Sequence, residues 1–276
     1  MKNTRSHNFI LYLPLIVCLL YIVWWLGINN LDWPNRDNYT DTYSLVALTG
    51  AIAGIVAGRK WGLFHSKFGR VLGFFALGLL GQFFGQLIYA LYFRFGDVEL
   101  AFPSVGDVPF LLTGIFYFLG VYNLLKVIVY KGSIFKPWII LVTSILATAL
   151  LLWLMYISFL NIALEDERGT IYSLTNAAYS IILIFYFLLG LVALMQARRM
   201  SGGKMLKPVA IMLIALIMQY LADFSFLYQS YHDTWEAASS NDLFYVIAYG
   251  AMALSILLID RTRRQVVVAN EAEPRV

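Results

Sequence analysis

Eight long apolar runs, separated by polar gaps, make up most of this chain. They cover residues 9–27, 42–58, 71–92, 108–130, 137–161, 170–197, 207–230 and 242–260. A helix needs roughly 20 apolar residues to cross the hydrocarbon core of a bilayer. The runs are continuous rather than alternating, which favours helices over a membrane barrel, because a helix satisfies its own backbone hydrogen bonds in lipid. The pattern predicts an all-α integral membrane protein with eight transmembrane helices.

The composition indicates that the function of the chain lies within the bilayer. Of the 276 residues, 61% are hydrophobic and 13% are charged, whereas a soluble domain has about 45–50% apolar and about 25% charged residues. The first run resembles a secretion signal, but it is long and lacks a small-residue cleavage site, so we expect a retained helix. Cys18 is the only cysteine, which excludes an intrachain disulfide.

The charges in the gaps alternate in sign, and this alternation predicts the orientation. The basic gaps and ends contain Lys2, Arg5, Arg59, Lys60, Lys67, Arg70, Lys126, Lys131, Lys136, Arg198, Arg199, Lys204, Lys207, Arg261, Arg263, Arg264 and Arg275. The acidic gaps contain Asp32, Asp37, Asp41, Asp97, Glu99, Asp107, Glu165, Asp166, Glu167, Asp233, Glu236 and Asp242, with Arg36, Arg94 and Arg168 as the exceptions. By the positive-inside rule, both termini are cytoplasmic. The net charge of +4 reflects this orientation, and we expect no nucleic-acid partner.

The two halves of the chain look like copies of one four-helix unit. Gln82-Phe-Phe-Gly-Gln-Leu-Ile-Tyr89 in the third run matches Gln219-Tyr-Leu-Ala-Asp-Phe-Ser-Phe226 in the seventh, and the helices that follow begin alike. We therefore expect repeats at 1–131 and 132–265, with a disordered cytoplasmic tail at 266–276. Each repeat has an even number of helices, so the duplication would be parallel, about an axis along the membrane normal. Chance similarity between apolar helices is the alternative.

Small residues at helical spacing predict close helix packing. Gly50, Gly54 and Gly58 recur every four residues in the second run, and Gly81 and Gly85 do so in the third. This spacing lets helix backbones approach each other in lipid.

Asp223 is the most informative single residue, because it lies inside the seventh run. A carboxylate there costs at least ~2.5 kcal/mol, so we expect it to face the protein interior or a wet cavity. Gln82, Gln86 and Tyr89 share one face of the third run, and Gln219 and Asp223 form the corresponding face of the seventh. We expect the two faces to meet across the pseudo-symmetry axis.

Asn176 and Tyr179 of the sixth run would join these faces in a polar cluster in the outer half of the membrane. Buried amides need hydrogen-bond partners, so bonding between helices alone accounts for such a cluster. A ligand pocket is the alternative explanation, and a proton-sensing role is a further possibility for the carboxyl group.

The outer gaps supply helix caps and aromatic rings. We expect Asp107 and Asp242 to be N-caps that accept backbone N–H groups, with Ser104 beside the first of them on the rim of an outward-facing cavity. The rings in these gaps are Trp33, Tyr39, Tyr43, Tyr92, Phe93, Phe102, Tyr228, Tyr231 and Trp235. They suit an interfacial aromatic belt, and some could cap an apolar ligand.

Several enzymes and cofactors lack the residues that they require. The three histidines, His7, His65 and His232, lie on different segments, which argues against haem and against a zinc site. No lysine lies in the middle of a run, and no glycine-rich phosphate loop or nucleophile elbow is present. We expect no cofactor, no metal and no catalytic residue.

Two short motifs carry a resemblance to a known group of membrane regions. Pro103-Ser-Val-Gly-Asp-Val-Pro-Phe110 joins a Pro-Ser-x-x-Asp turn to an apolar helix, and Gln219–Asp223 is followed by Asp242-Leu-Phe-Tyr245. These motifs resemble those of the multi-pass regions ahead of bacterial diguanylate cyclase, cyclic-diguanylate phosphodiesterase and histidine kinase domains. The likeness covers most of 40–260. It implies a sensory or ligand-binding domain of the bacterial inner membrane.

Three functions follow from these expectations. The first is a membrane sensor that binds a small or lipophilic signal in its outer half; since about a dozen residues follow Arg264, signalling would need a cytoplasmic partner or a homo-oligomer. The second is a small transporter or channel, because internal repeats and a mid-membrane acid are common there. The third is a structural subunit that recruits a partner through 59–70 and 198–207.

Overall fold

The computed structural model describes residues 2–96, 103–128, 136–165, 170–197, 203 and 205–272, and within these ranges it places the side chains of 9–265 except 137, 163 and 165. The charged residues named above that lie outside the described residues are Asp97, Glu99, Lys131, Asp166, Glu167, Arg168, Arg198, Arg199, Lys204 and Arg275, together with the side chains of Lys2, Arg5 and Glu165. The expected boundary between the repeats at 131 and 132 also lies outside them.

Helices make up almost all of the described chain. They are α1 (Lys2–Asn30), α2 (Arg36–Thr42), α3 (Leu45–Lys60), the 3₁₀ turn η1 (Leu63–His65), α4 (Lys67–Phe95), α5 (Asp107–Ile128), α6 (Pro137–Met155), the π-helical turn η3 (Tyr156–Leu160), α7 (Asn161–Glu165), α8 (Thr170–Ala197), α9 (Leu206–Tyr231) and α10 (Ser240–Ala272). No strand occurs in these residues.

Eight segments of the described chain are long and apolar enough to cross a bilayer, and they coincide with the eight runs in the sequence. The short α2 and the long α3 together form the second segment (Arg36–Lys60), and α6 with η3 forms the fifth (Trp138–Leu160). The prediction of an all-α membrane protein with eight spanning helices is confirmed. One boundary differs from expectation, because α10 continues to Ala272 and so extends into the tail expected from residue 266.

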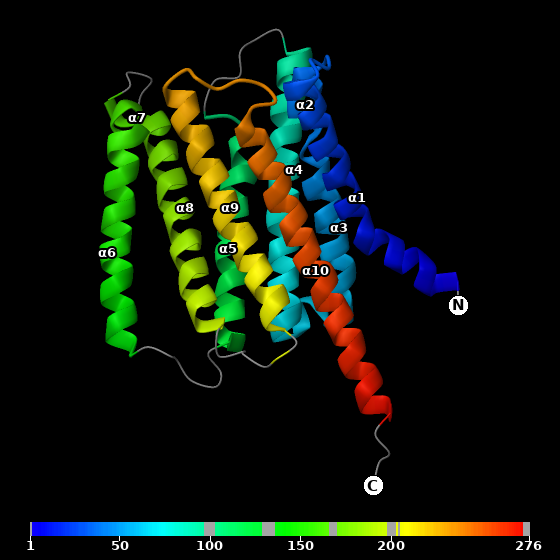
Figure 1. Ribbon diagram of the computed structural model, residues 1–276. Helices are drawn as coiled ribbons and strands as arrows, with labels where there is room; N and C mark the ends of the chain where they lie inside the picture. Colours follow the sequence, from blue (N-terminus) through cyan, green and yellow to red (C-terminus); the bar gives the residue numbers. More distant parts are fainter. Residues whose placement is uncertain are drawn as a thin grey trace.

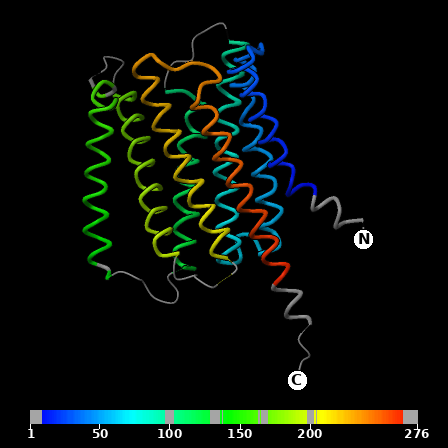
Figure 2. Tube along the Cα trace, viewed as in Figure 1, coloured from blue at the N-terminus to red at the C-terminus, as the bar shows by residue number. Residues whose placement is uncertain are grey.

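Six of the spanning helices pack in a ring, in the order α3, α4, α5, α8, α9 and α10, and α10 returns to α3. From outside, α1 packs against both α3 and α10, whereas α6 packs against α8. Figure 1 shows α1 and α6 at opposite edges of the bundle. Figure 2 shows the α9–α10 loop crossing the upper end. We call this upper end the acidic end, because the segments with Asp32–Asp41 and Asp233–Asp242 lie there, and the opposite end the basic end.

The half of the ring toward the basic end is filled by apolar side chains. Phe75 of α4, Val121 of α5, Met212 of α9 and Ile256 of α10 have no exposed area. This apolar layer lies between the polar side chains at the acidic end and a second set of buried polar side chains toward the basic end, which includes Ser255 and Asp260.

The glycines with helical spacing lie at helix contacts, as expected. A Cβ atom on Gly54 of α3 would lie 2.9 Å from the Ala76 Cβ of α4, and one on Gly81 of α4 would lie 2.7 Å from the Pro109 carbonyl oxygen of α5. Real Cβ atoms do not approach that closely, so the two contacts require glycine.

Asp260 joins α3 to α10 at the basic end. Its side chain is fully buried and pairs with Lys60 Nζ at 2.7 Å and with Arg264 Nη2 at 2.5 Å. Two cations therefore neutralise this buried carboxylate, and the ring is closed by a charged contact at this point.

Candidate functional site: a polar cavity at the acidic end

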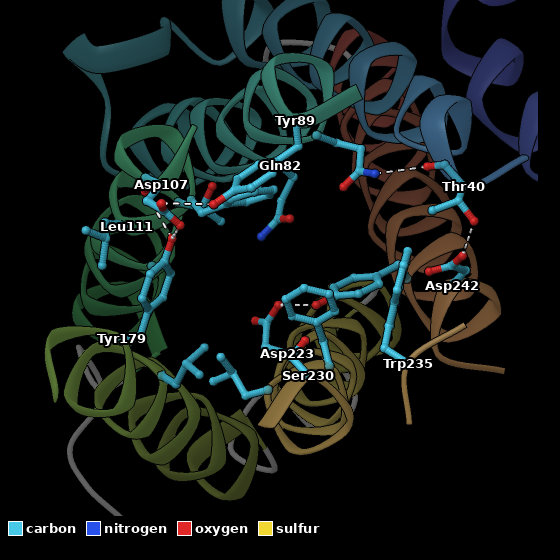
Figure 3. Close-up of a pocket in the computed structure, with 18 of the residues that line it drawn as sticks. Thr40, Gln82, Tyr89, Asp107, Leu111, Tyr179, Asp223, Ser230, Trp235 and Asp242 are labelled. Atoms are coloured by element: carbon cyan, nitrogen blue, oxygen red, sulfur yellow. Dashed lines mark hydrogen bonds between the residues drawn. The ribbon is translucent and has the colours of Figure 1, made fainter. Parts of the chain in front are cut away.

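A cavity of about 520 Å³ lies inside the ring at the acidic end. Its wall is formed by α2, the turn after α2, α4, α5, α8, α9, the α9–α10 loop and the start of α10. Figure 3 shows side chains from these segments pointing inward from all sides. Small-molecule sites in proteins usually have volumes of roughly 300–1,000 Å³, so the cavity has the size of a ligand site.

Asp223 lies on the α9 wall of the cavity, about 12 Å from the end of its helix at 1.5 Å per residue. One oxygen accepts from the Tyr186 hydroxyl of α8 at 2.6 Å. The other accepts from the Tyr245 hydroxyl of α10 at 2.9 Å and from Gln219 Nε2 at 2.9 Å. The carboxyl group thus joins three helices and remains accessible from the cavity. Its placement agrees with the expectation that an acid at this depth faces away from lipid.

Gln82 lies on the α4 wall, opposite Asp223 (Figure 3), and Gln86 of the same helix also lines the cavity. Gln82 Oε1 accepts from the Tyr249 hydroxyl of α10 at 3.0 Å, and Gln86 Nε2 donates to the Thr40 carbonyl at 3.0 Å. The polar faces of the third and seventh spans therefore do not bond to each other, as a packed cluster would require. They face each other across the cavity, because α4 and α9 occupy opposite positions in the ring.

Asp107 lies at the start of α5, between α4 and α8. Its carboxyl group accepts from the Tyr89 hydroxyl at 2.9 Å, from the Tyr179 hydroxyl at 3.0 Å and from the Ser104 backbone N–H at 2.6 Å. Tyr89 and Tyr179 line the cavity, while Ser104 does not. This group of side chains fixes α5 to both of its neighbours at the acidic end.

Asp242 has the corresponding position at the start of α10. Its carboxyl group accepts from the Thr40 hydroxyl at 2.6 Å and from the Ala238 backbone N–H at 3.0 Å. It therefore binds α2 and the end of the α9–α10 loop to the beginning of α10.

The caps of α5 and α10 differ from the expected arrangement. Asp107 and Asp242 lie within the helices and accept N–H groups from residues before them. The hydroxyls that accept N–H groups from the following residues belong to serines: Ser104 from Gly106 at 3.1 Å, and Ser239 from Asn241 at 3.3 Å. The reason is geometric, since a carboxyl group in the first helical turn reaches back to the cap residue, as in a capping box.

Asn176 of α8 lines the cavity and is held by α9. Its Oδ1 accepts from the Tyr231 hydroxyl, and its Nδ2 donates to the Tyr172 carbonyl at 3.0 Å. Of the expected ligand-binding set, only Gln219 does not line the cavity; it is fully buried behind Asp223, and its Oε1 has no hydrogen-bond partner among the described residues.

Sequence reasoning missed the tyrosines that hold the polar groups. Tyr186, Tyr245 and Tyr249 lie inside apolar runs, where they count as ordinary aromatic residues of a membrane helix. A tyrosine hydroxyl far from the ends of a span needs a partner, and this requirement was the available signal. Of the rings in the outer gaps, Tyr43, Phe93, Tyr231 and Trp235 line the cavity, whereas Phe102 lies outside the described residues.

The fold and the site define a multi-pass membrane protein whose bundle of apolar helices surrounds a polar and aromatic cavity. No protein-family model, no curated protein and no solved structure matches the chain. The resemblance to bacterial membrane sensory regions therefore rests on the two short motifs alone.

Proposed function

We propose that the chain is a sensory input module of the bacterial cytoplasmic membrane that binds a small or lipophilic molecule in the cavity at its acidic end. The distribution of Lys and Arg supports an orientation with both termini in the cytoplasm, so the cavity lies in the outer half of the membrane. The observation that carries the proposal is the cavity itself, because polar groups from α4, α5, α8, α9 and α10 converge on an interior space of ligand size.

The apolar layer toward the basic end argues for binding rather than transport. Phe75, Val121, Met212 and Ile256 lie between the cavity and the basic end and have no exposed area. A transporter or channel requires a polar path that reaches the other side of the membrane in at least one state. Binding at one end of a packed bundle suits a receptor.

α10 offers a route from the cavity to the cytoplasmic side. It contributes Asp242 and Tyr245 to the cavity wall, and Asp260 follows about 27 Å further along the same helix at 1.5 Å per residue. A ligand that repositions the start of α10 would change the contact of Asp260 with Lys60. The size of this response is limited by the difference in ligand affinity between the two arrangements of the helix.

The order of helix contacts supports the duplication. If α1, α3, α4 and α5 correspond to α6, α8, α9 and α10, then the contacts α3–α4, α4–α5 and α5–α8 correspond to α8–α9, α9–α10 and α10–α3, and all six occur. The carboxyl groups of Asp107 and Asp242 take equivalent places in this scheme. A cavity on the axis between two such repeats is also where ligands bind in duplicated membrane proteins.

Native mass spectrometry of the protein extracted in a mild detergent tests the binding proposal. Leu111→Trp fills the cavity from the α5 wall, while Leu112→Trp is the matched control, because Leu112 is exposed on the outer surface of the same helix. We expect a co-purified small molecule in the wild type and in Leu112→Trp, and its loss in Leu111→Trp.

Two variants on opposite walls extend this test. Asp223→Asn and Gln86→Leu should reduce the thermal stabilisation that the recovered molecule gives to the wild type. If Leu111→Trp retains the molecule, or if the stabilisation persists unchanged in both wall variants, the molecule does not bind here and the proposal fails.

A further inference from the structure

Among the residues that the structure describes, the cavity wall carries carboxyl groups and no basic side chain. Asp107, Asp223 and Asp242 line its interior, and Asp37 and Asp41 line the part beside α2. No Lys, Arg or His occurs among the lining residues of the described chain. Nearby, Arg94 pairs with Asp41 at 2.5 Å on the exposed side of α2, which leaves the three interior carboxyl groups without a cationic partner from the wall.

Within the described residues, the donors to the interior carboxyl groups are all uncharged. Asp223 accepts from two tyrosine hydroxyls and an amide, Asp107 accepts from tyrosine hydroxyls and a backbone N–H, and Asp242 accepts from a threonine hydroxyl and a backbone N–H. Such donors orient a carboxylate and stabilise it, but they do not cancel its charge. The electrostatic potential of three carboxylates would therefore add up inside the cavity, where low-dielectric walls focus it.

Asp260 shows how this chain treats a buried carboxylate that has a purely structural role. Lys60 and Arg264 both contact it, so its charge is compensated within the protein. The contrast indicates that the charge at the acidic end is left for a group that comes from outside the chain.

Aromatic rings surround the same space and favour positive charge. Tyr43 and Tyr245 are stacked with their ring centres 5.9 Å apart, and Phe110, Tyr231 and Trp235 line other parts of the wall. The face of an aromatic ring attracts cations, and rings of this kind form the cages that recognise quaternary ammonium groups.

Gln82 adds a requirement for a hydrogen-bond acceptor. Only 5% of the surface of this residue is exposed, and its side-chain oxygen is already bonded to Tyr249. Its Nε2 group has no partner among the described residues and points into the cavity (Figure 3). Since this N–H group is open to the cavity and unused by the protein, a ligand there gains a hydrogen bond by offering an oxygen to it.

A metal ion does not fit this arrangement. Within the described part of the chain, no three His, Cys, Asp or Glu side chains are close enough together to coordinate one ion. The carboxyl groups lie on separate walls of a cavity of about 520 Å³, which suits an extended organic molecule better than a single ion.

We propose that the ligand is an organic monocation, a protonated or quaternary amine, that also carries an uncharged hydroxyl or carbonyl oxygen. The ammonium group lies against Asp223 and the neighbouring rings, and the oxygen accepts from Gln82 Nε2 on the opposite wall. This inference rests on the proposed function, because it specifies the ligand of the same cavity.

Three probes of similar shape separate charge from oxygen. The first is benzylated choline, in which a benzyl group replaces one methyl group of choline. The second is its uncharged isostere, in which a quaternary carbon replaces the nitrogen. The third is benzyltrimethylammonium, which keeps the charge and lacks the hydroxyl. Phenylpropionate serves as the anion. Affinities are measured by calorimetry on the full-length protein in an uncharged maltoside detergent.

In the wild type, we expect benzylated choline to bind about tenfold more tightly than its uncharged isostere, which corresponds to about 1.4 kcal/mol and lies within the range of cation–π and carboxylate contacts. Asp223→Asn should remove most of this preference. Asp233→Asn is the matched control, since Asp233 is an exposed acid at the same end of the bundle and does not line the cavity. Gln82→Leu should lower the affinity for benzylated choline and leave the affinity for benzyltrimethylammonium unchanged.

The wild-type affinity ratio decides the question even if Asp223→Asn does not fold. An isostere or an anion that binds as tightly as the cation would overturn the charge preference and leave the cavity as a ligand site. A preference that Asp223→Asn and Asp233→Asn reduce equally would overturn the assignment to Asp223. If no probe of any charge binds and no small molecule co-purifies with the wild type, the binding function itself fails.

Discussion

The two seams at which the halves of the ring meet are built differently. At the first seam, α10 packs against α3, and α1 covers the junction by packing against both helices. Bonds tie its two ends, Thr40 to Asp242 at the acidic end and Lys60 to Asp260 at the basic end. At the second seam, α5 packs against α8 and Tyr179 donates to Asp107 at the acidic end. The helix in the position equivalent to α1 is α6, which packs against α8.

This difference leads to a prediction about which seam opens more readily. When a seam covered by a third helix opens, it loses the contacts between its two helices and also contacts of these helices with the third. A seam without such a helix loses only the contacts between its two helices. Local opening follows the regions with fewest buried contacts. We therefore expect the α5–α8 seam to open more readily than the α3–α10 seam, and each experiment below compares the two.

Cross-linking should give the largest difference. In a Cys18→Ala background, Gly114→Cys with Ile182→Cys bridges α5 and α8, since a Cβ on Gly114 would lie 3.5 Å from Ile182 Cβ. Oxidation of this pair should slow ligand release by about tenfold or more, or about 1.4 kcal/mol of barrier. Gly250→Cys can bridge α10 to the native Cys18 of α1, because the two Cβ atoms would lie 3.2 Å apart, and oxidation there should change the release rate much less.

The reduced form of each variant is the control for these cross-links, and ligand exchange followed by native mass spectrometry is the measurement. Equal slowing at both seams would show that neither moves independently. If only the cross-link to Cys18 slows ligand release, the first seam is the one that opens more readily.

Steric wedges should give the next largest effect, on stability. Gly250→Leu forces a side chain against Cys18 Sγ of α1, which lies 2.3 Å from the new Cβ, on a helix that packs against both α1 and α3. Gly114→Leu meets the Ile182 side chain at an uncovered junction. Overpacking costs about 1–3 kcal/mol or more, and we expect the first variant to be the less stable in denaturant titrations in detergent. A larger loss in Gly114→Leu would contradict a rigid first seam.

Removal of one hydroxyl from each seam should give a smaller effect. Thr40→Val leaves Asp242 with the Ala238 N–H as its remaining partner, so we expect a loss of about 1–3 kcal/mol in the free energy of unfolding. Tyr179→Phe leaves Asp107 with Tyr89 and Ser104, and we expect a loss of about 1 kcal/mol. Thermal unfolding measures both losses. A larger loss of stability in Tyr179→Phe than in Thr40→Val would show that Tyr89 and Ser104 do not stabilise Asp107 enough without Tyr179.

The contact between α1 and the α9–α10 loop should have the smallest effect. Trp25 Nε1 donates to the Ser239 carbonyl at 2.9 Å, and Trp25→Phe removes this bond while keeping an aromatic ring. We expect a loss of about 1 kcal/mol, confined to the loop, and faster hydrogen exchange at the Ala238 amide. An unchanged exchange rate would show that Thr40 and Asp242 hold that amide without help from Trp25.

More of the helical architecture than of the site could be predicted from the sequence. Hydropathy alone predicts the eight helices, because lipid leaves a chain few other ways to satisfy its backbone. The depth of Asp223 in its run likewise predicts that it avoids lipid. The order of helices around the ring depends on which small and large side chains fit together, and no periodicity carries that information. For this reason the opposed positions of Gln82 and Asp223, and the bond from Tyr245 to Asp223, could not be predicted.

The length of α10 has a consequence for its angular register. The helix is unbroken from Ser240 to Ala272, and each residue turns an α-helix by about 100°. A single residue inserted between Tyr249 and Asp260 would keep the first on the ring interior and rotate the second away from Lys60. The rotation of Asp260 relative to the cavity residues of α10 is thus fixed by the number of residues between them. An insertion there would uncouple the two ends of the helix and leave every side chain of the cavity unchanged.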